Sequence, residues 1–247
     1  MKKVLIFFGS RGYEKVKRRL CKSAVKYFDE IIAYSEEDID KEFYISNIKI
    51  FQHWRGWGYW LWKPYFIAKT LERLKDNDLC FYLDATGEFL SSPEILMNNC
   101  ISNNGILLFE NSSFINFHWT KMDCFNLMGL TEEKYVHGYQ ADAAVQIYQK
   151  NQWNTAFVQE MLAYSKNYHI LTDAPNITGL NLPGFKDHRH DQSILSLLAI
   201  KYQVPLVRSP RQVGSYPDST ESRIIALNRD VNKERAFYKL LLKKERR

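Results

Sequence analysis

Val4-Leu-Ile-Phe-Phe8 is a short run of apolar residues that stops at Gly9-Ser10. A run without polar residues is typical of a strand that is buried on both faces of a parallel sheet. Residues 13–28 follow with apolar side chains four positions apart and Lys and Arg between them, which predicts an amphipathic helix. Residues 30–34 read as a second strand, so the chain opens with the strand–helix–strand unit of a doubly wound sheet.

The rest of the chain continues this alternation of short apolar runs and amphipathic segments. We therefore expect an α/β fold with a mostly parallel central sheet flanked by helices, in a single domain over residues 1–215. A polar and then basic helical C-terminal extension is expected over residues 216–247. Further strands are predicted at 48–51, 79–83, 105–109 and 168–171, and further helices at 64–75, 132–150, 155–167 and 191–201.

The composition is that of a packed globular protein. Of the 247 residues, 45% are hydrophobic and 25% are charged, which argues against disorder. The net charge of +6 suits an anionic partner, but Lys and Arg do not form the basic stripe of a nucleic-acid-binding protein, and we expect no nucleic-acid partner. Basic residues gather only at 239–247, which either end a solvated helix or make peripheral contact with a membrane.

The cysteines are far apart in the sequence and form no Cys-x-x-Cys pair, so neither a zinc cluster nor a disulfide framework is indicated. Buried thiols of this kind are typical of a reducing compartment. No apolar run reaches the length of about 18 residues that a membrane-spanning helix needs. We therefore expect a cytoplasmic protein, at most peripheral at the inner face of a membrane. The cysteines are Cys21, Cys80, Cys100 and Cys124.

A carboxylate stands at the end of one predicted strand. Residues 79–83 are apolar and end at Asp84, and ligands of open α/β sheets bind at the carboxyl ends of the strands. Asp84 is a candidate ligand for Mn²⁺ or Mg²⁺, which would also hold a diphosphate, and Glu88 is a candidate second ligand. The alternative is that Asp84 caps a turn with its side chain.

A second group of polar residues, His188-Arg-His-Asp-Gln-Ser193, stands where a helix is predicted to begin. It supplies a candidate metal ligand in His188, a cation for phosphate in Arg189, and a carboxylate in Asp191 that is suited to act as a base or to hold an acceptor hydroxyl. The alternative is that Asp191 caps the helix and that the other side chains are solvated.

Between the two groups lies a segment dense in aromatic residues, Gly56-Trp-Gly-Tyr-Trp-Leu-Trp-Lys-Pro-Tyr65. Aromatic rings can stack on sugars, but we expect most of these to pack in the core. Lys63, which precedes Pro64, is the polar residue expected to point into a cleft.

Three of these segments, residues 59–65, 82–85 and 188–195, resemble in order and separation a group of bacterial and large-virus GT-A type glycosyltransferases of surface-polysaccharide and glycan assembly. The resemblance spans roughly positions 4 to 205. It implies a GT-A, Rossmann-like fold, a nucleotide-sugar donor, and a divalent metal held by an Asp-x-Asp-like motif. Thr86 stands where the second Asp of that motif would be, so the second metal ligand stays open among Glu88, His188 and His190.

The resemblance also implies roles for individual residues. Asp191 and Gln192 would lie beside the donor sugar and the acceptor as the catalytic pair, and Asp191 would either deprotonate the acceptor hydroxyl or position it. Lys63 and Arg189 would stabilise the departing diphosphate. Gly9-Ser10-Arg11, directly after the first strand, would contact the nucleotide.

The function expected from these features is metal-assisted transfer of a sugar, hexosyl or deoxyhexosyl, from a nucleotide-diphosphate sugar. The acceptor would be a glycan, a polysaccharide in biosynthesis or a lipid-linked saccharide. The alternative is a catalytically inactive protein on the same fold that binds carbohydrate or nucleotide, because fold alone does not dictate function.

Overall fold

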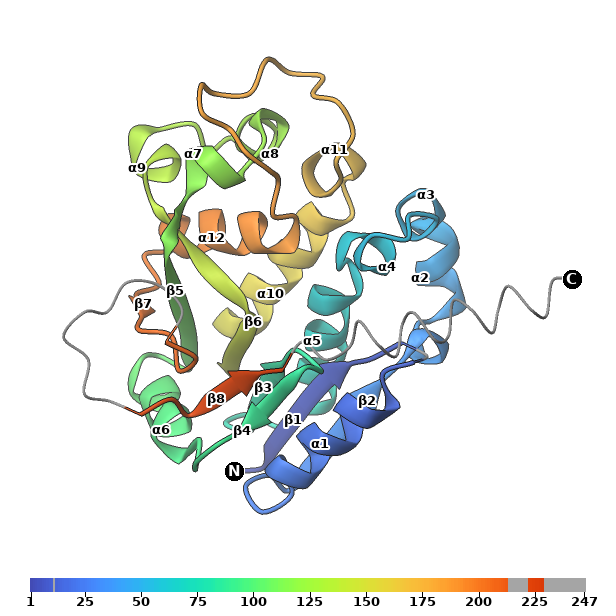
Figure 1. Cartoon of the computed structure of the whole chain (residues 1–247), viewed down its shortest axis with the longest axis vertical. Coiled ribbons are helices and arrows are strands. Elements are labelled where there is room, and N and C mark those ends of the chain that lie inside the picture. The colour runs from blue at the N-terminus through green and yellow to red at the C-terminus, as the bar shows by residue number, and fades with distance from the viewer. Residues whose placement is uncertain (11, 213–221, 229–247) are drawn as a thin grey trace, which may run out of the picture.

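The computed structural model describes residues 1–10, 12–212 and 222–228. Its central sheet is mostly parallel, because every strand but β6 points the same way (Figure 1). The fold class predicted from the sequence, an α/β domain with helices around such a sheet, is confirmed. The six strands lie in the order β2 (Glu30–Tyr34), β1 (Lys3–Phe8), β3 (Leu79–Leu83), β6 (Tyr139–Gln149), β5 (Ile106–Ile115) and β7 (Leu206–Val207).

Both faces of the sheet are covered, which explains why its strands are continuously apolar. Alternate side chains of a strand point to opposite faces. In β1, Leu5 and Phe7 belong to one hydrophobic cluster, whereas Val4 and Ile6 belong to the other. The first face carries α1 (Glu14–Ala24), α6 (Glu94–Ser102) and a ladder of β4 (Gly87–Phe89) with β8 (Ile225–Leu227), and the second carries α5 (Trp62–Arg73), α10 (Gln152–Ser165) and α12 (Asp191–Lys201).

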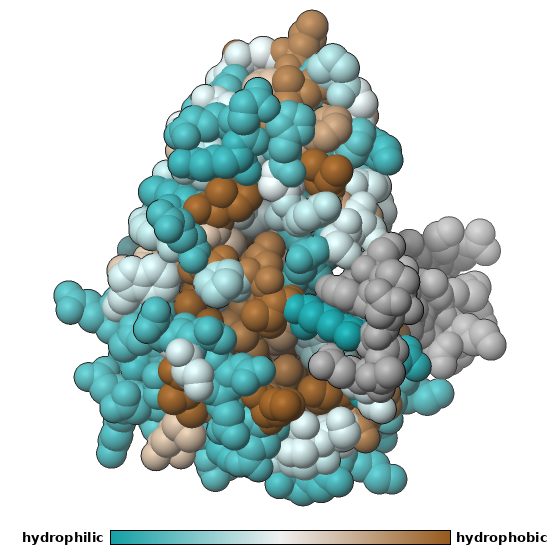
Figure 2. Space-filling view, turned by 90° about the vertical axis from the view of Figure 1, so that its left-hand side faces the viewer, coloured by the Kyte–Doolittle hydropathy of each residue, from teal (hydrophilic) through white to brown (hydrophobic). Residues whose placement is uncertain are grey.

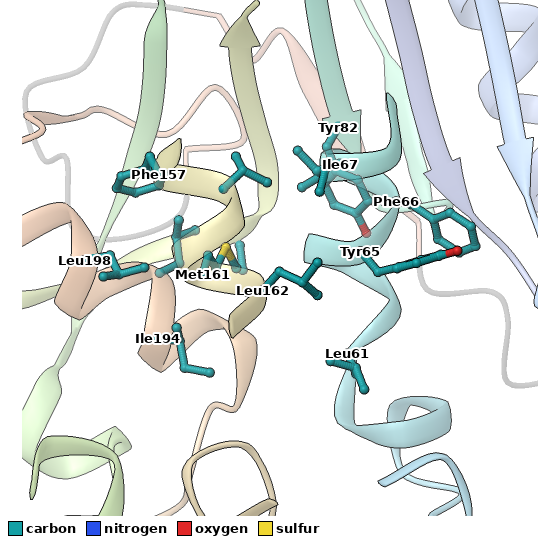
Figure 3. Packing of buried hydrophobic residues seen from close by; sticks show 14 of the residues in the cluster. Leu61, Tyr65, Phe66, Ile67, Tyr82, Phe157, Met161, Leu162, Ile194 and Leu198 are labelled. Atoms are coloured by element: carbon teal, nitrogen blue, oxygen red, sulfur yellow. The ribbon is translucent and has the colours of Figure 1, made fainter. Parts of the chain in front are cut away.

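On the second face, the apolar side chains of α10 lie between those of α5 and α12 (Figure 3). Met161 is fully buried, and Leu162 points toward α5. The remaining helices are short. They are η1 (Glu36–Asp38), α2 (Lys41–Ser46), α3 (Ile48–Phe51), α4 (Gly56–Tyr59), α7 (Asn116–Trp119), α8 (Met122–Met128), α9 (Glu133–Val136) and α11 (Tyr168–Leu171).

Most elements predicted from the sequence are present, with shifted ends, and three predictions are wrong. Residues 48–51 and 168–171 form α3 and α11 instead of strands, because a segment of only four mostly apolar residues does not distinguish a strand from a helical turn. Residues 132–150 form α9 and then β6 instead of one helix. The Ala-rich sequence of β6 favours a helix, but burial between β3 and β5 overrides that local preference.

The segment assigned to the C-terminal extension is described only at residues 222–228. There, β8 pairs antiparallel with β4, and Ile225 is fully buried against the first face of the sheet. Residues 216–221 and 229–247, with the basic end, lie outside the described residues. Within the described ranges, the structure has no helix that is both long and apolar enough to span a membrane.

The surface is mixed in character. Figure 2 shows the side on which α9, β5 and α6 lie in Figure 1, and hydrophobic residues reach this surface in patches between hydrophilic ones. Exposed apolar residues are usual on folded proteins, so this side alone points to no partner.

The cysteines are all free thiols. Three of them, Cys80, Cys100 and Cys124, are buried, and Cys21 is half-buried.

Because α12 packs against β6 and α10, we expect a large loss of stability when a buried side chain of α12 is shortened. We expect Leu198→Ala, at a site with 0% exposure, to lower the free energy of unfolding by about 2 to 5 kcal/mol, because it leaves a cavity. The same change at Leu180, which is 90% exposed, should alter it by less than about 0.5 kcal/mol. Urea denaturation of both variants measures this, and equal losses would contradict the packing described.

Candidate functional site

The chain enters α5 through a left-handed turn. Every residue from 56 to 60 has a positive φ, and three of them are not glycine: Trp57 at 45°, Tyr59 at 53° and Trp60 at 61°. This conformation costs roughly 1–2 kcal/mol for each residue that has a Cβ atom. At Gly58, a Cβ atom would lie 2.8 Å from the ring of Phe51, so glycine is needed there for space as well.

Aromatic packing holds this turn in place. The ring of Phe8, at the end of β1, stacks on Trp62 at 4.1 Å and on Trp57 at 5.6 Å between centroids. The Trp62 indole also donates a hydrogen bond to the carbonyl of Gly56, at 2.8 Å. The predicted packing role of Trp57 and Trp62 is therefore seen, and it fixes the start of α5, where Lys63 stands.

Lys63 is buried and lies between two carboxylates. Its ammonium nitrogen is 2.8 Å from Asp191 Oδ2 and 3.5 Å from Asp84 Oδ1, and it donates to the carbonyl of Ala143 at 3.2 Å. The side chains of Lys63 and Asp191 are only 4% and 5% exposed, whereas that of Asp84 is 32% exposed. We call Lys63, Asp84 and Asp191 the Lys63 cluster. It presents the carboxylate of Asp84 partly to solvent and keeps that of Asp191 buried.

Burial and charge shift the proton affinities of this cluster. Burial disfavours the ammonium of Lys63, but the Asp191 and Asp84 carboxylates outweigh it and raise the pKa of Lys63. Burial raises the pKa of Asp191 to about 6, against the opposing attraction of Lys63. Tyr82 donates to Asp84 Oδ1 at 2.6 Å, and its pKa is raised well above the usual value by burial and by Asp84.

Neither carboxylate serves as a cap in the way that the alternatives drawn from the sequence require. The turn after β3 is closed by the backbone, with the amide of Gly87 donating to the carbonyl of Asp84 at 2.7 Å. Asp191 is the first residue of α12, and the residue at the N-cap position is His190, whose side chain makes no capping bond. Both carboxylates therefore remain available to the cluster.

His190 fixes the entry to α12 in a second unfavourable backbone conformation, with φ 53° and ψ −121°. Its ring Nδ1 donates to the carbonyl of Leu171 at 2.8 Å, and its ring lies 5.4 Å from that of Trp60. Burial is the main reason that the pKa of His190 falls to about 4, so the ring is neutral at pH 7. The contact between Trp60 and His190 thus connects the two strained segments, which precede Lys63 and Asp191 in the sequence.

Two neighbouring cavities open beside the cluster. The first, of about 180 Å³, has a largely aromatic wall, and the second, of about 510 Å³, is lined with charged and polar groups. Trp60 and Asp84 line both, so they mark the border. From the predicted site, Gly9 and Ser10 line the first cavity with Asp84, whereas Lys63, Arg189, Asp191 and Gln192 line the second.

The polar side chains of the second cavity are held in place by neighbours. The guanidinium carbon of Arg189 lies 4.7 Å from the ring centre of Phe114 and 4.6 Å from that of Trp119. The Gln192 amide donates to Gln140 Oε1 at 2.6 Å. Gln140 in turn donates to the carbonyl of Trp119. Arg189 and Gln192 are therefore oriented before any ligand binds.

The structure places two of the predicted residues, Glu88 and His188, apart from this cluster. Glu88 accepts a hydrogen bond from Asn228 and faces Arg19 in a separate pocket. His188 is buried with both ring nitrogens engaged, Nδ1 by the amide of Lys121 and Nε2 by the carbonyl of Ile170. Burial holds the pKa of His188 well below its usual value. A further predicted residue, Arg11, lies outside the described residues, so its place is not described.

Neither Glu88 nor His188 therefore joins Asp84, whereas His190 lines the second cavity together with Asp84. Within residues 1–10, 12–212 and 222–228, no group of three or more His, Cys, Asp or Glu side chains is placed to hold a metal ion. A metal site with fewer protein ligands would use the Asp84 carboxylate together with oxygens that a ligand brings, which is a mode that Mg²⁺ uses with phosphates.

The second cavity is also lined by Asp142 and Arg211, which were not singled out from the sequence. Asp142 is buried on β6, and its Oδ2 accepts from Nε of Arg211 at 2.7 Å. Asp142 was not identified as a site residue because residues 132–150 were predicted to form a helix instead of β6. A single Asp in a run of Ala and Val residues was the available signal, since a buried carboxylate needs a partner.

Comparisons with known proteins support the fold. No family model matches the sequence, and no curated protein matches it. Among solved structures, the apo form of mouse xyloside xylosyltransferase 1 aligns with a TM-score of 0.50 at 10% identity, over 93% of this chain and 98% of that one. The chain thus shares a GT-A-like glycosyltransferase fold.

Two structures of the glycosyltransferase GlyE from Streptococcus pneumoniae TIGR4 also align. For one, the TM-score is 0.43 at 14% identity, and for the other, an apo form, it is 0.39 at 17% identity. The alignments cover 84% and 88% of this chain and 45% and 46% of the GlyE chains. This chain therefore spans less than half the length of those GlyE chains.

The raised pKa of Asp191 predicts a pH dependence of stability. An unfolded Asp has a pKa of about 3.9, so folding favours the protonated form. Asp191 therefore contributes most to stability below pH of about 4, and the contribution is lost as the pH rises through about 6. We expect wild-type stability, relative to Asp191→Asn, to fall between pH 4 and 7. Urea denaturation across this range measures it, and parallel pH profiles would show that Asp191 has an ordinary pKa.

Proposed function

We propose that this protein is a glycosyltransferase that moves a sugar from a nucleoside-diphosphate sugar to a glycan or polysaccharide acceptor, assisted by Mn²⁺ or Mg²⁺. The observation that carries the proposal is the Lys63 cluster. It holds Asp84 and Asp191 together at the carboxyl end of β3, where an aromatic cavity meets a charged one. A donor and an acceptor would each need one of these cavities, and the reacting atoms would meet at their border.

The aromatic cavity suits the nucleotide. Gly9 and Ser10 follow β1 and leave room beside the rings of Tyr13 and Trp57, which offer flat faces to a base. From there, the diphosphate would extend toward Asp84 at the border of the two cavities. This places the negative charges of the donor next to the part of the cluster that is open to solvent.

The metal would bind to Asp84 and to oxygens of the diphosphate. Asp84 supplies a partly exposed carboxylate, which is a ligand that hard cations prefer. When bound, the ion would offset the charge that develops on the departing diphosphate. Glu88 and His188 are not proposed as ligands, because their side chains are engaged elsewhere.

The chemistry itself would be carried by the residues of the second cavity. The acceptor oxygen attacks the anomeric carbon, the bond from that carbon to the β-phosphate oxygen breaks, and the electron pair leaves with the nucleoside diphosphate. Asp191 would take the proton of the acceptor hydroxyl, and its raised pKa is suited to proton transfer near neutral pH. Lys63 and Arg189 would supply fixed positive charge close to the leaving group.

The acceptor would enter through the charged cavity, whose volume of about 510 Å³ is within the range of small-molecule sites. Gln192, held by Gln140, would contact the donor sugar or the acceptor there. Polar and charged walls suit the hydroxyl groups of a glycan or the head of a lipid-linked saccharide. We propose that this takes place in the cytoplasm.

Removal of either carboxylate tests this proposal. In Mn²⁺, wild-type protein should release nucleoside diphosphate from at least one of UDP-glucose, UDP-galactose, UDP-N-acetylglucosamine, GDP-mannose and dTDP-rhamnose. We expect Asp84→Asn and Asp191→Asn to lower that rate by about 100-fold or more, because each removes a group that acts in the transition state. Liquid chromatography of the released nucleotide measures the rate.

Asp76→Asn is the matched control, since Asp76 is exposed and lies outside both cavities. It should keep the wild-type rate. If folded Asp84→Asn and Asp191→Asn also keep that rate, the assignment of the site is wrong. If wild-type protein consumes none of the donors but binds a nucleotide, the catalytically inactive binding protein is the better account.

A further inference from the structure

A third cavity, of about 660 Å³, lies at the opposite end of the sheet from the Lys63 cluster. Gln149, which lines it, pairs with Leu79 at the start of β3, whereas Asp84 follows the other end of that strand. The walls come from the end of α6, the start of β5, the start of α10 and the segment after α12. The cavity is therefore separate from the site described above.

The chemistry of this cavity is neutral. Among the residues that the structure describes, its lining contains no Asp, Glu, Lys or Arg, although 25% of the residues of the chain are charged. Side-chain amides take their place. An amide offers both donors and an acceptor, which matches the paired hydroxyl groups of a sugar. The amides belong to Asn103, Asn104, Gln149, Asn151, Gln152 and Gln203.

Two aromatic rings form a corner in the same cavity. Trp153 is 44% exposed and Tyr202 is 38% exposed, and their rings lie 5.8 Å apart at an angle of 86°. Trp153 stacks on the buried ring of Phe157, and the hydroxyl of Tyr202 donates to Glu160. Both rings are thus held by neighbours while each stays partly exposed, which suits contact with the apolar face of a sugar ring.

The loops around the corner are fixed as well. The buried amide of Asn154 donates to the carbonyls of Asn104, Gly105 and Gln149, at 3.3, 2.8 and 2.8 Å. The side chain of Asn151 caps α10 by accepting from the amide of Asn154 at 2.7 Å. A site with fixed walls loses less conformational entropy when it binds a ligand.

Some of the amides are not used by the fold. Among the described residues, the side chains of Asn104, Gln152 and Gln203 make no hydrogen bond to the protein. They are therefore free to bond a ligand, whereas Asn103 and Gln149 bond to the carbonyls of Asn99 and Asn77.

We propose that this cavity is a second saccharide site, which binds a neutral glycan chain away from the site of transfer. A charged ligand would find no counter-charge in the lining, and a purely apolar one would leave the amides without partners. Binding at this cavity requires no chemistry at Lys63, so its presence or absence can be tested independently of the proposed transfer reaction.

An array of neutral oligosaccharides tests this site, with glucans, galactans, mannans, xylans and N-acetylhexosamine polymers as probes. We expect the full chain to bind at least one of them, with an affinity that hardly depends on salt. Trp153→Ala should weaken that binding at least tenfold, because it removes the stacking face. Gln152→Ala, an exposed change at the first residue of α10, should weaken it more modestly without disturbing the fold.

Two control variants locate the binding at this cavity. Trp54→Ala removes a tryptophan that is 81% exposed and lies outside the three cavities, and it should bind as wild type does. Asp191→Asn should also keep the binding, since it alters only the candidate site of transfer. The proposal is overturned if no neutral oligosaccharide binds, or if binding survives in both Trp153→Ala and Gln152→Ala with unchanged affinity.

Discussion

The structure depends on a buried positive charge. The ammonium of Lys63 reaches from α5 to β6 through Ala143, to α12 through Asp191 and to the end of β3 through Asp84. A charge taken out of water costs several kcal/mol unless it is paired and hydrogen-bonded. These three elements and α5 must therefore meet at one point, and that point is where both cavities open.

Two strained segments bring this charge to its place. The left-handed turn at residues 56–60 starts α5, and His190 starts α12 in an unfavourable conformation, and the rings of Trp60 and His190 lie against each other. Unfavourable backbone of this kind persists only where the surroundings compensate for it, and it clusters at functional sites. Here the compensation comes from aromatic packing, which explains why this part of the sequence is so rich in Trp and Tyr.

The sequence predicted the fold class and brought together part of the candidate site for identifiable reasons. Apolar runs such as residues 4–8 and 79–83 are read correctly because both faces of the sheet are covered. Three residues were singled out by their neighbours in the sequence: Lys63 by the aromatic segment 56–65, Asp84 by the apolar run 79–83, and Asp191 by the polar group 188–193. Asp142 was missed because the local preference of β6 for a helix gave the wrong element. The separation of Glu88 and His188 from Asp84 depends on tertiary packing, which no spacing in the sequence reveals.

The proposed function requires the Lys63 cluster to border a site for a nucleoside diphosphate. Isothermal titration calorimetry with UDP, GDP and dTDP, with and without Mn²⁺, tests it most directly, because binding does not require the correct sugar or acceptor. We expect at least one of them to bind more tightly with Mn²⁺, and Asp84→Asn to abolish this gain. A nucleotide site at this cluster is contradicted if none binds at millimolar concentration, or if folded Asp84→Asn shows the same dependence on Mn²⁺ as wild type.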